Sequence, residues 1–131
     1  MEIAVDPGFP TYAGGLGVLA GDILRSAADL GVPMAGVTLV HRKGYFRQRL
    51  DADGQQREDP QPWDPEKVLE PIEPNVTLQL CGRLVKVRAW RYWIAGVNGH
   101  SVPVYFLDTD LPENLEELNI DRLVYEPKIP L

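Results

Sequence analysis

The residues best placed to bind a ligand in this sequence are the glycines of the loop at residues 14–17. Gly14, Gly15 and Gly17 precede the first turn of a predicted helix. The N–H groups of a first helical turn have no partners within the helix, and with the helix dipole they favour a negative group. Because glycine leaves these groups uncovered, the loop predicts an anion site with phosphate as its natural ligand. A purely structural role, in which the glycines permit a tight connection and close packing, stays open on these residues alone.

The same loop also fits a dinucleotide-binding pattern, G-x-G-x-x-A, at residues 15–20. That pattern requires the glycines directly after a strand, whereas the proline-rich stretch at residues 7–10 separates them from the preceding apolar residues. In addition, the strand predicted to end near Val40 is followed by His41 and not by a carboxylate that would bind a ribose. A dinucleotide-binding domain is therefore the weaker alternative.

The elements expected to position this loop alternate between strand and helix. Apolar residues recur at three- and four-residue spacing from Leu16 to Leu30, and Gly31 stands where a helix C-cap belongs, so the pattern predicts an amphipathic helix. Residues 3–5 form a short β-prone stub, and the unbroken apolar run at residues 34–40 predicts a strand buried on both faces. Together these features predict a βαβ unit within residues 1–50.

The rest of the chain is expected to be loops and antiparallel strands. A polar strand at residues 44–50 ends in a turn, and residues 51–74 are predicted to be loop-rich because prolines interrupt them, apart from a short helix starting at Asp64-Pro65. Asn98-Gly99 is a strong hairpin signal. The remaining segments are an antiparallel β region at residues 75–112, with strands at 76–80, 84–94 and 101–107, and a divergent tail at 113–131.

Composition and charge restrict the partners of the chain. Its 131 residues carry a net charge of −6, which disfavours general attraction to nucleic acid or to an anionic membrane and suits a neutral partner such as a sugar polymer. No apolar run approaches the length of about 20 residues that a helix needs to span a bilayer. The first residues do not resemble a signal peptide, and the single cysteine, Cys81, cannot form an internal disulfide. We therefore expect a cytoplasmic protein.

Other reactive or aromatic residues give weaker indications. His41 and His100 are the only histidines and are too scattered to predict a metal site. Strand alternation sends Trp90 and Tyr92 to one face and Trp93 to the other, so core packing is favoured over a sugar-stacking surface.

Four stretches of the sequence resemble the N-terminal part of bacterial and archaeal α-glucan (glycogen/maltodextrin) phosphorylases. The longest covers residues 1–22 and contains Gly14-Gly15-Leu16-Gly17; the others are residues 26–33, 44–48 and 102–112. Glycogen and starch synthases share the Gly-Gly-Leu-Gly core, but the longer stretches favour the phosphorylases.

This resemblance implies an α/β fold that is part of a GT-B N-terminal Rossmann-like domain with an inserted antiparallel β region. The implied reaction is reversible phosphorolysis of a terminal α-1,4-glucosidic bond, which releases glucose 1-phosphate. The resemblance also implies that the backbone at Gly14, Gly15 and Leu16 approaches the substrate phosphate and the glucosyl unit, and that Glu2 lies at the same cleft. Pyridoxal 5′-phosphate is bound mainly by the C-terminal domain of such enzymes.

The Schiff-base lysine and the phosphate-gripping basic residues of the family have no counterparts in these 131 residues. We therefore expect residues 1–131 to be a partial phosphorylase domain that does not hold pyridoxal phosphate by itself and is inactive without a C-terminal domain. The expected partners are glucan and phosphate, together with either that domain or a second copy through self-association. A non-catalytic glucan- or phosphate-binding remnant is the main alternative.

Overall fold

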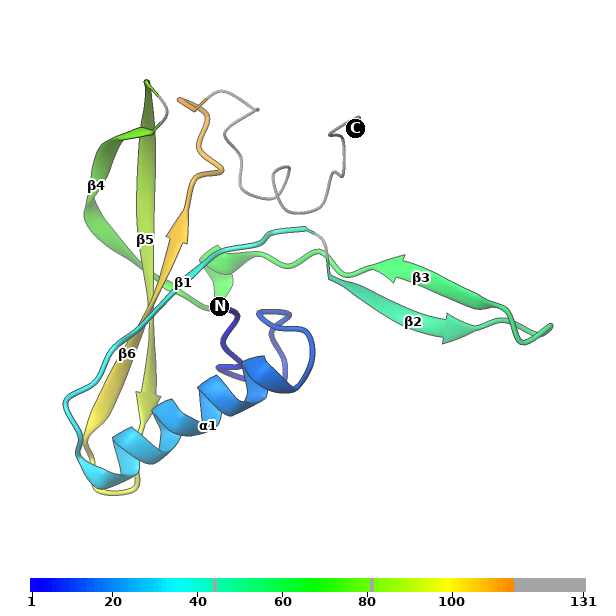
Figure 1. The fold of residues 1–131 in the computed structure, drawn as a ribbon, viewed down its shortest axis with the longest axis horizontal. Helices are drawn as coiled ribbons and strands as arrows, with labels where there is room; N and C mark the ends of the chain where they lie inside the picture. The colour runs from blue at the N-terminus through cyan, green and yellow to red at the C-terminus, as the bar shows by residue number, and fades with distance from the viewer. Residues whose placement is uncertain (44, 81, 115–131) are drawn as a thin grey trace.

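The computed structural model describes residues 1–43, 45–80 and 82–114, which form a mixed α/β fold. Figure 1 shows a four-stranded sheet with one long helix beside it and a two-stranded hairpin that extends away from both. In chain order the elements are α1 (Gly15–Leu30), β1 (Gly36–Leu39), β2 (Phe46–Leu50), β3 (Gln56–Pro60), the 3-10 helix η1 (Pro65–Lys67), β4 (Glu70–Leu80), β5 (Arg83–Ala95) and β6 (Ser101–Asp108).

The four-stranded sheet has the order β1-β6-β5-β4. Strand β1 runs parallel to β6, with Thr38 opposite Phe106, whereas β4–β5 and β5–β6 are antiparallel. The predicted hairpin at Asn98-Gly99 is confirmed: the Gly96 N–H donates to the His100 carbonyl over 2.8 Å, and Gly99 has a φ of 80°. A turn of this kind brings β5 and β6 together, and β6 in turn places β1.

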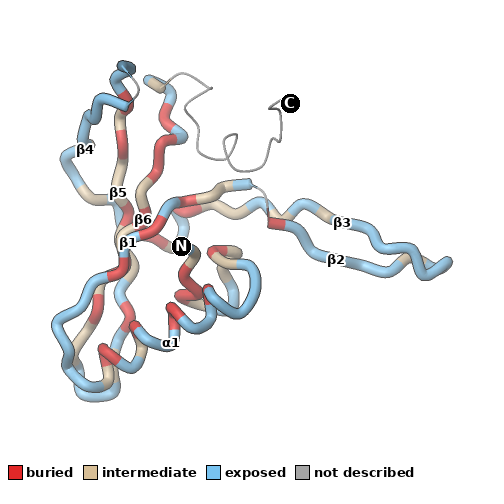
Figure 2. The backbone as a smooth tube through the Cα atoms, in the orientation of Figure 1, coloured by how far each residue is buried: buried red, intermediate tan, exposed pale blue. Residues whose placement is uncertain are grey.

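The core lies between α1 and one face of the sheet, where the buried parts of the chain gather in Figure 2. Alternate residues of β6 point into it: Val102, Val104 and Phe106 are at most 1% exposed. Trp90 of β5 joins them at 3% exposure, and its indole N–H donates to the buried Asp108 carboxylate over 3.0 Å. Core packing is thus confirmed for Trp90, while Trp93 is 46% exposed on the opposite face.

The predicted helix and its C-cap are confirmed, but two predictions about the flanking strands are wrong. Residues 3–5 are not a strand; they are a buried, irregular segment packed along α1. Strand β1 is shorter than the predicted run and is buried on one face only, with Val37 60% and Leu39 38% exposed. An apolar run shows that a segment can be buried on two faces, but not whether the second face is covered.

Residues 51–74 contain more strand than their prolines suggested. Strand β3 pairs with β2 in antiparallel register, and β4 begins at Glu70, earlier than predicted. The prolines are tolerated because β4 is an edge strand whose register with β5 shifts between Ile72 and Val76, and Pro60 ends β3. The predicted short helix is confirmed as η1, where the Asp64 side chain accepts from the Glu66 N–H. Cys81 and residues 115–131 of the predicted tail lie outside the described residues.

Within the described part of the chain, no helix is long and apolar enough to cross a bilayer.

Gly21 is the point at which α1 approaches the N-terminal segment most closely. A Cβ added there would lie 2.1 Å from the carbonyl oxygen of Ala4. We expect Gly21→Ala to lower the free energy of unfolding by about 1–3 kcal/mol, because the backbone must shift to make room. Urea denaturation measures this. Gly15→Ala is the matched control on the same helix, since a Cβ at Gly15 meets nothing within 4 Å; equal stability of the two variants would contradict the close approach.

Candidate functional site

The N-terminal segment is fixed by its backbone, and this determines where Glu2 lies. The Ala4 N–H donates to the Gly17 carbonyl over 3.0 Å, which ties the segment to the first turn of α1. Thr11 and Thr38 donate their hydroxyls to the carbonyls of Ile3 and Met1, over 2.7 and 2.8 Å. Buried backbone N–H and C=O groups need hydrogen-bond partners, and here the two threonine side chains supply the partners of the Ile3 and Met1 carbonyls. The segment therefore lies beside the start of α1 in a defined position.

The glycine loop leads into α1 without a side chain to cap it. Gly14 is the N-cap, with a φ of 80° that glycine adopts readily, and within the described part of the chain this end of the helix has no side-chain cap hydrogen bond. The first turn also contains no acidic residue. The loop is exposed, and the Leu16 side chain is 74% exposed. This end of α1 thus offers N–H groups and the positive end of the helix dipole toward open space.

The glycines of the loop are needed for different reasons. A Cβ at Gly17 would lie 2.6 Å from the Cβ of Tyr12, so packing requires glycine there. At Gly15 a Cβ would meet nothing within 4 Å, and its φ is not in the left-handed region. Neither packing nor backbone conformation therefore explains the glycine at position 15, and its missing side chain leaves space next to the helix terminus.

Glu2 joins the loop to the base of β2. One carboxylate oxygen of Glu2, Oε2, accepts from the Ala13 N–H over 2.8 Å, and the other, Oε1, accepts from the Tyr45 hydroxyl over 2.8 Å. Ala13 directly precedes Gly14, so the structure brings Glu2 next to the loop with which the sequence associated it. The sequence reasoning missed Tyr45, because its partner is 43 residues away and no spacing signal connects them. Tyr45 is 9% exposed, and its ring packs edge-on against His41.

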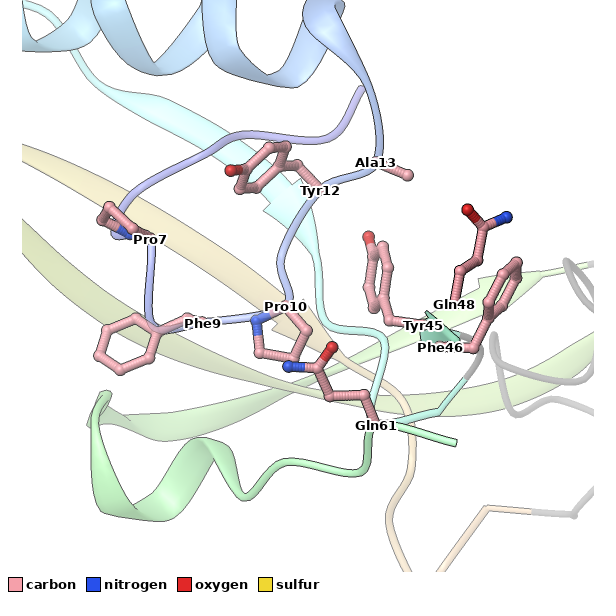
Figure 3. Close-up of a pocket in the computed structure, with 9 residues that line it drawn as sticks. All are labelled: Pro7, Phe9, Pro10, Tyr12, Ala13, Tyr45, Phe46, Gln48 and Gln61. Carbon is pink, nitrogen blue, oxygen red and sulfur yellow. The ribbon is translucent and has the colours of Figure 1, made fainter. Parts of the chain in front are cut away.

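A pocket of about 470 Å³ opens beside Ala13. Figure 3 shows one wall formed by the segment from Pro7 to Ala13 and another formed by Tyr45, Phe46 and Gln48, with Gln61 beneath. Its lining side chains are uncharged; they are Pro7, Phe9, Pro10, Tyr12, Ala13, Tyr45, Phe46, Gln48 and Gln61. The Phe9 ring stacks on Trp63 and makes an edge contact with Tyr92. Burial, with the nearby Asp6 charge, raises the pKa of Tyr92.

Asp51 and the two histidines take part in structural contacts. Asp51 accepts from the N–H groups of Asp53 and Gln55 and from Arg57 in the β2–β3 turn, and the Arg57 hydrogen bond lowers its pKa. The imidazole of His100 lies 3.3 Å from the Val32 carbonyl, whereas the ring of His41 packs against Tyr45. The two histidines therefore have different neighbours. In the described ranges, no three His, Cys, Asp or Glu side chains gather as a metal-binding group.

Comparison with known proteins assigns the family. A family model of carbohydrate phosphorylases matches residues 2–112. The chain belongs to the carbohydrate phosphorylase family. It is 44% identical to a glycogen phosphorylase of Mycobacterium tuberculosis (strain CDC 1551) over 134 residues, which cover 94% of this chain and 15% of that protein. It is also 38% identical over 123 residues to a maltodextrin phosphorylase of Thermococcus litoralis, covering 87% of this chain and 14% of that one.

A third relative, a glycogen phosphorylase of Aquifex aeolicus, is 37% identical over 108 residues, which cover 79% of this chain and 15% of the relative. The chain therefore spans about 15% of the length of the curated phosphorylases it matches. The family match includes Glu2, the glycine loop and every residue that lines the pocket.

The two hydrogen bonds of the Glu2 carboxylate, to the Ala13 N–H and to the Tyr45 hydroxyl, form a bridge between the loop and β2. This Glu2 bridge predicts a local effect on the loop. We expect Glu2→Ala to remove the acceptor of the Ala13 N–H and to speed hydrogen exchange of that amide by about two- to tenfold, because a hydrogen bond is worth about 0.5–1.5 kcal/mol. NMR-detected amide exchange measures this. Tyr45→Phe should show a smaller increase, since it leaves Glu2 in place. Glu70→Ala is the control, as it removes an exposed glutamate that pairs with Arg91 in the sheet; equal Ala13 exchange in Glu2→Ala and Glu70→Ala would count against the bridge.

Proposed function

We propose that this chain is the N-terminal part of an α-glucan phosphorylase, which uses phosphate to cleave terminal α-1,4-glucosidic bonds and releases glucose 1-phosphate. In this proposal the backbone of Gly14, Gly15 and Leu16 faces the substrate phosphate and the glucosyl unit, and Glu2 lies at the same cleft. The observation that carries the proposal is the open space at Gly15, beside an uncapped helix terminus that Glu2 helps to hold. Family membership supports this reaction class.

The arrangement suits phosphorolysis because that reaction needs positioned dipoles more than a strong nucleophile of the protein. Phosphate is itself the attacking group, and positive character develops on the sugar as the bond breaks. N–H groups that are already oriented can bind the phosphate without reorganising during the reaction. The exposed loop can provide such groups, while Glu2 and Tyr45 fix the residue that precedes it.

The glycine loop and the pocket lining do not fit the cofactor of the family. Phosphorylases of this family use pyridoxal 5′-phosphate, which requires a lysine to form a Schiff base. Neither the glycine loop nor the pocket lining contains a lysine. We therefore assign no cofactor-binding residue in this chain and derive no step through the cofactor.

Activity is proposed to require further polypeptide that completes a GT-B architecture, in which this segment is part of the N-terminal Rossmann-like domain and residues 1–50, 51–74, 75–112 and 113–131 are its sections. The exposed second face of β1 is consistent with a surface that such polypeptide covers. The cytoplasm remains the proposed location, because the sequence contains one cysteine and no disulfide partner for it.

The two alternatives differ in their support. A non-catalytic glucan- or phosphate-binding role is supported by the pocket beside the loop. A dinucleotide-binding domain is disfavoured by the fold, since the glycines of that motif must directly follow a strand and residues 3–5 are not a strand here.

The deciding experiment is a reconstitution assay. We expect no glucose 1-phosphate from maltodextrin and phosphate with this chain alone, and measurable release when it is mixed with the remaining segment of the Mycobacterium tuberculosis relative and pyridoxal phosphate. Gly15→Ala should reduce the reconstituted rate by tenfold or more, about 1.4 kcal/mol, because its methyl group fills the substrate space. Ser26→Ala, exposed on the same helix, is the control. Turnover by the chain alone, or full activity of Gly15→Ala, would refute this proposal.

A further inference from the structure

Helix α1 has a larger apolar surface than its packing in this structure uses. Figure 2 shows the helix alternating between buried and exposed residues. The buried ones are Gly17, Ala20, Gly21, Leu24, Ala27 and Ala28. A second apolar side is exposed, and it includes Ile23 and Leu30, which are 50% and 77% exposed. At about 3.6 residues per turn the two sides together cover roughly 200° of the helix, whereas one packed face needs about 100°. The described part of the chain therefore leaves one apolar side of α1 uncovered.

The exposed side of α1 forms one wall of a groove. The other wall is the segment that follows the helix, where Val32 and Met34 are each 39% exposed. The groove has a volume of about 410 Å³, and Leu19, Ile23 and Leu30 line it. Their spacing of four and seven residues places them in a row along the helix, as in the apolar seam of two packed helices. The groove therefore fits a second helix that lies alongside α1.

The side of the groove that is farther from the sheet is acidic. Asp22 lines the groove, and Asp29, seven residues later, lies in the same row of α1. Arg25 is the single basic residue in the sequence of α1, and it is already bound to Asp22 and to the carbonyls of Ala4 and Val5. The last turn of α1 contains no basic residue, so the negative end of the helix dipole adds to these charges. A helix in the groove is therefore best complemented by a lysine or arginine beside its apolar residues.

The share of its relatives that the chain covers indicates where such a helix comes from. The chain spans about 15% of the length of the phosphorylases it matches, so most of the polypeptide of those proteins has no counterpart in it. We propose that the groove of α1 receives an amphipathic helix of this further polypeptide, with a basic residue facing Asp22. The inference rests on the proposed function, in which the chain requires such polypeptide. A second copy of the chain is a poorer occupant, because it would bring its own Asp22 and Asp29 to the contact.

Association with the remaining segment of the Mycobacterium tuberculosis relative, measured by isothermal titration calorimetry, tests the proposal. We expect Ile23→Ala to raise the dissociation constant about tenfold, because an apolar side chain is lost from the contact. Val18→Ala is the matched control. Val18 is a β-branched residue of the same helix and is 40% exposed, but it does not line the groove, so its variant should bind as the unchanged chain does.

The charge of the partner is tested separately with Asp22→Asn. This variant should weaken the association by up to about fivefold at low salt, because an exposed ion pair with the partner is lost. The difference from the unchanged chain should shrink in 0.5 M NaCl, since salt at about this concentration screens exposed charges. Tighter binding by Asp22→Asn would contradict a basic partner.

Three further outcomes would overturn the proposal. They are no measurable association, equal weakening by Ile23→Ala and Val18→Ala, and a dimer of the chain alone that sedimentation equilibrium detects and that Ile23→Ala dissociates. The last result would identify a second copy as the occupant of the groove. Failure of the proposed function gives a different pattern, in which the two segments associate with the same dependence on Ile23 but release no glucose 1-phosphate in the presence of pyridoxal phosphate.

Discussion

The close approach between the N-terminal segment and α1 determines where everything else in the site lies. It is possible because α1 presents glycine where a side chain would collide: Gly21 faces the Ala4 carbonyl, and the Gly17 carbonyl accepts from the Ala4 N–H. Arg25, one turn further along α1, donates to the carbonyls of Ala4 and Val5. An irregular backbone is thus buried with the polar groups of Ala4 and Val5 paired to one helix, while Thr11 and Thr38 pair with the carbonyls before them. This contact and the hydrogen bonds of the Glu2 carboxylate together hold Glu2 beside the loop.

Within a few residues, the same helix contains glycines that packing requires and one that faces open space. Gly17 and Gly21 are on the packed side, where an added Cβ would come within 3 Å of other atoms, whereas Gly15 faces open space. The sequence motif treats all of these glycines alike. The contacts that an added Cβ would make distinguish these glycines. Substitutions at different glycines of α1 can therefore test the stability of the fold and the function of the loop separately.

The features that could be predicted from sequence have local physical causes. The apolar spacing of α1, its Gly31 cap and the Asn98-Gly99 hairpin each depend on residues that are neighbours in the chain. Strand β3 was missed because both faces of the β2–β3 hairpin are exposed, so no apolar alternation marks it. Cross-strand ion pairs such as Arg49 with Asp59 help to join its strands.

The candidate site was only partly predictable for the same reason. The loop was identified from its glycines, and Glu2 from the family resemblance. Tyr45 and the pocket depend on a contact between segments far apart in the chain, which no local pattern reports. The one-sided burial of β1 was likewise not visible in its apolar run, because coverage of the second face depends on neighbours in space.

The electrostatics of the loop bear on the proposed phosphate site. A helix N-terminus contributes about 0.3–1 kcal/mol toward a nearby anion, whereas even millimolar affinity requires about 4 kcal/mol. The Glu2 carboxylate opposes an anion at the same place, although two hydrogen bonds engage it. Arg25 of α1 is committed to Asp22 and to backbone carbonyls, and the described residues that line the adjacent pocket include no cation. The glycine loop and the pocket lining, as far as the structure describes them, therefore supply oriented dipoles and uncharged side chains, and the proposed function assigns the positive charge that phosphate requires to another segment.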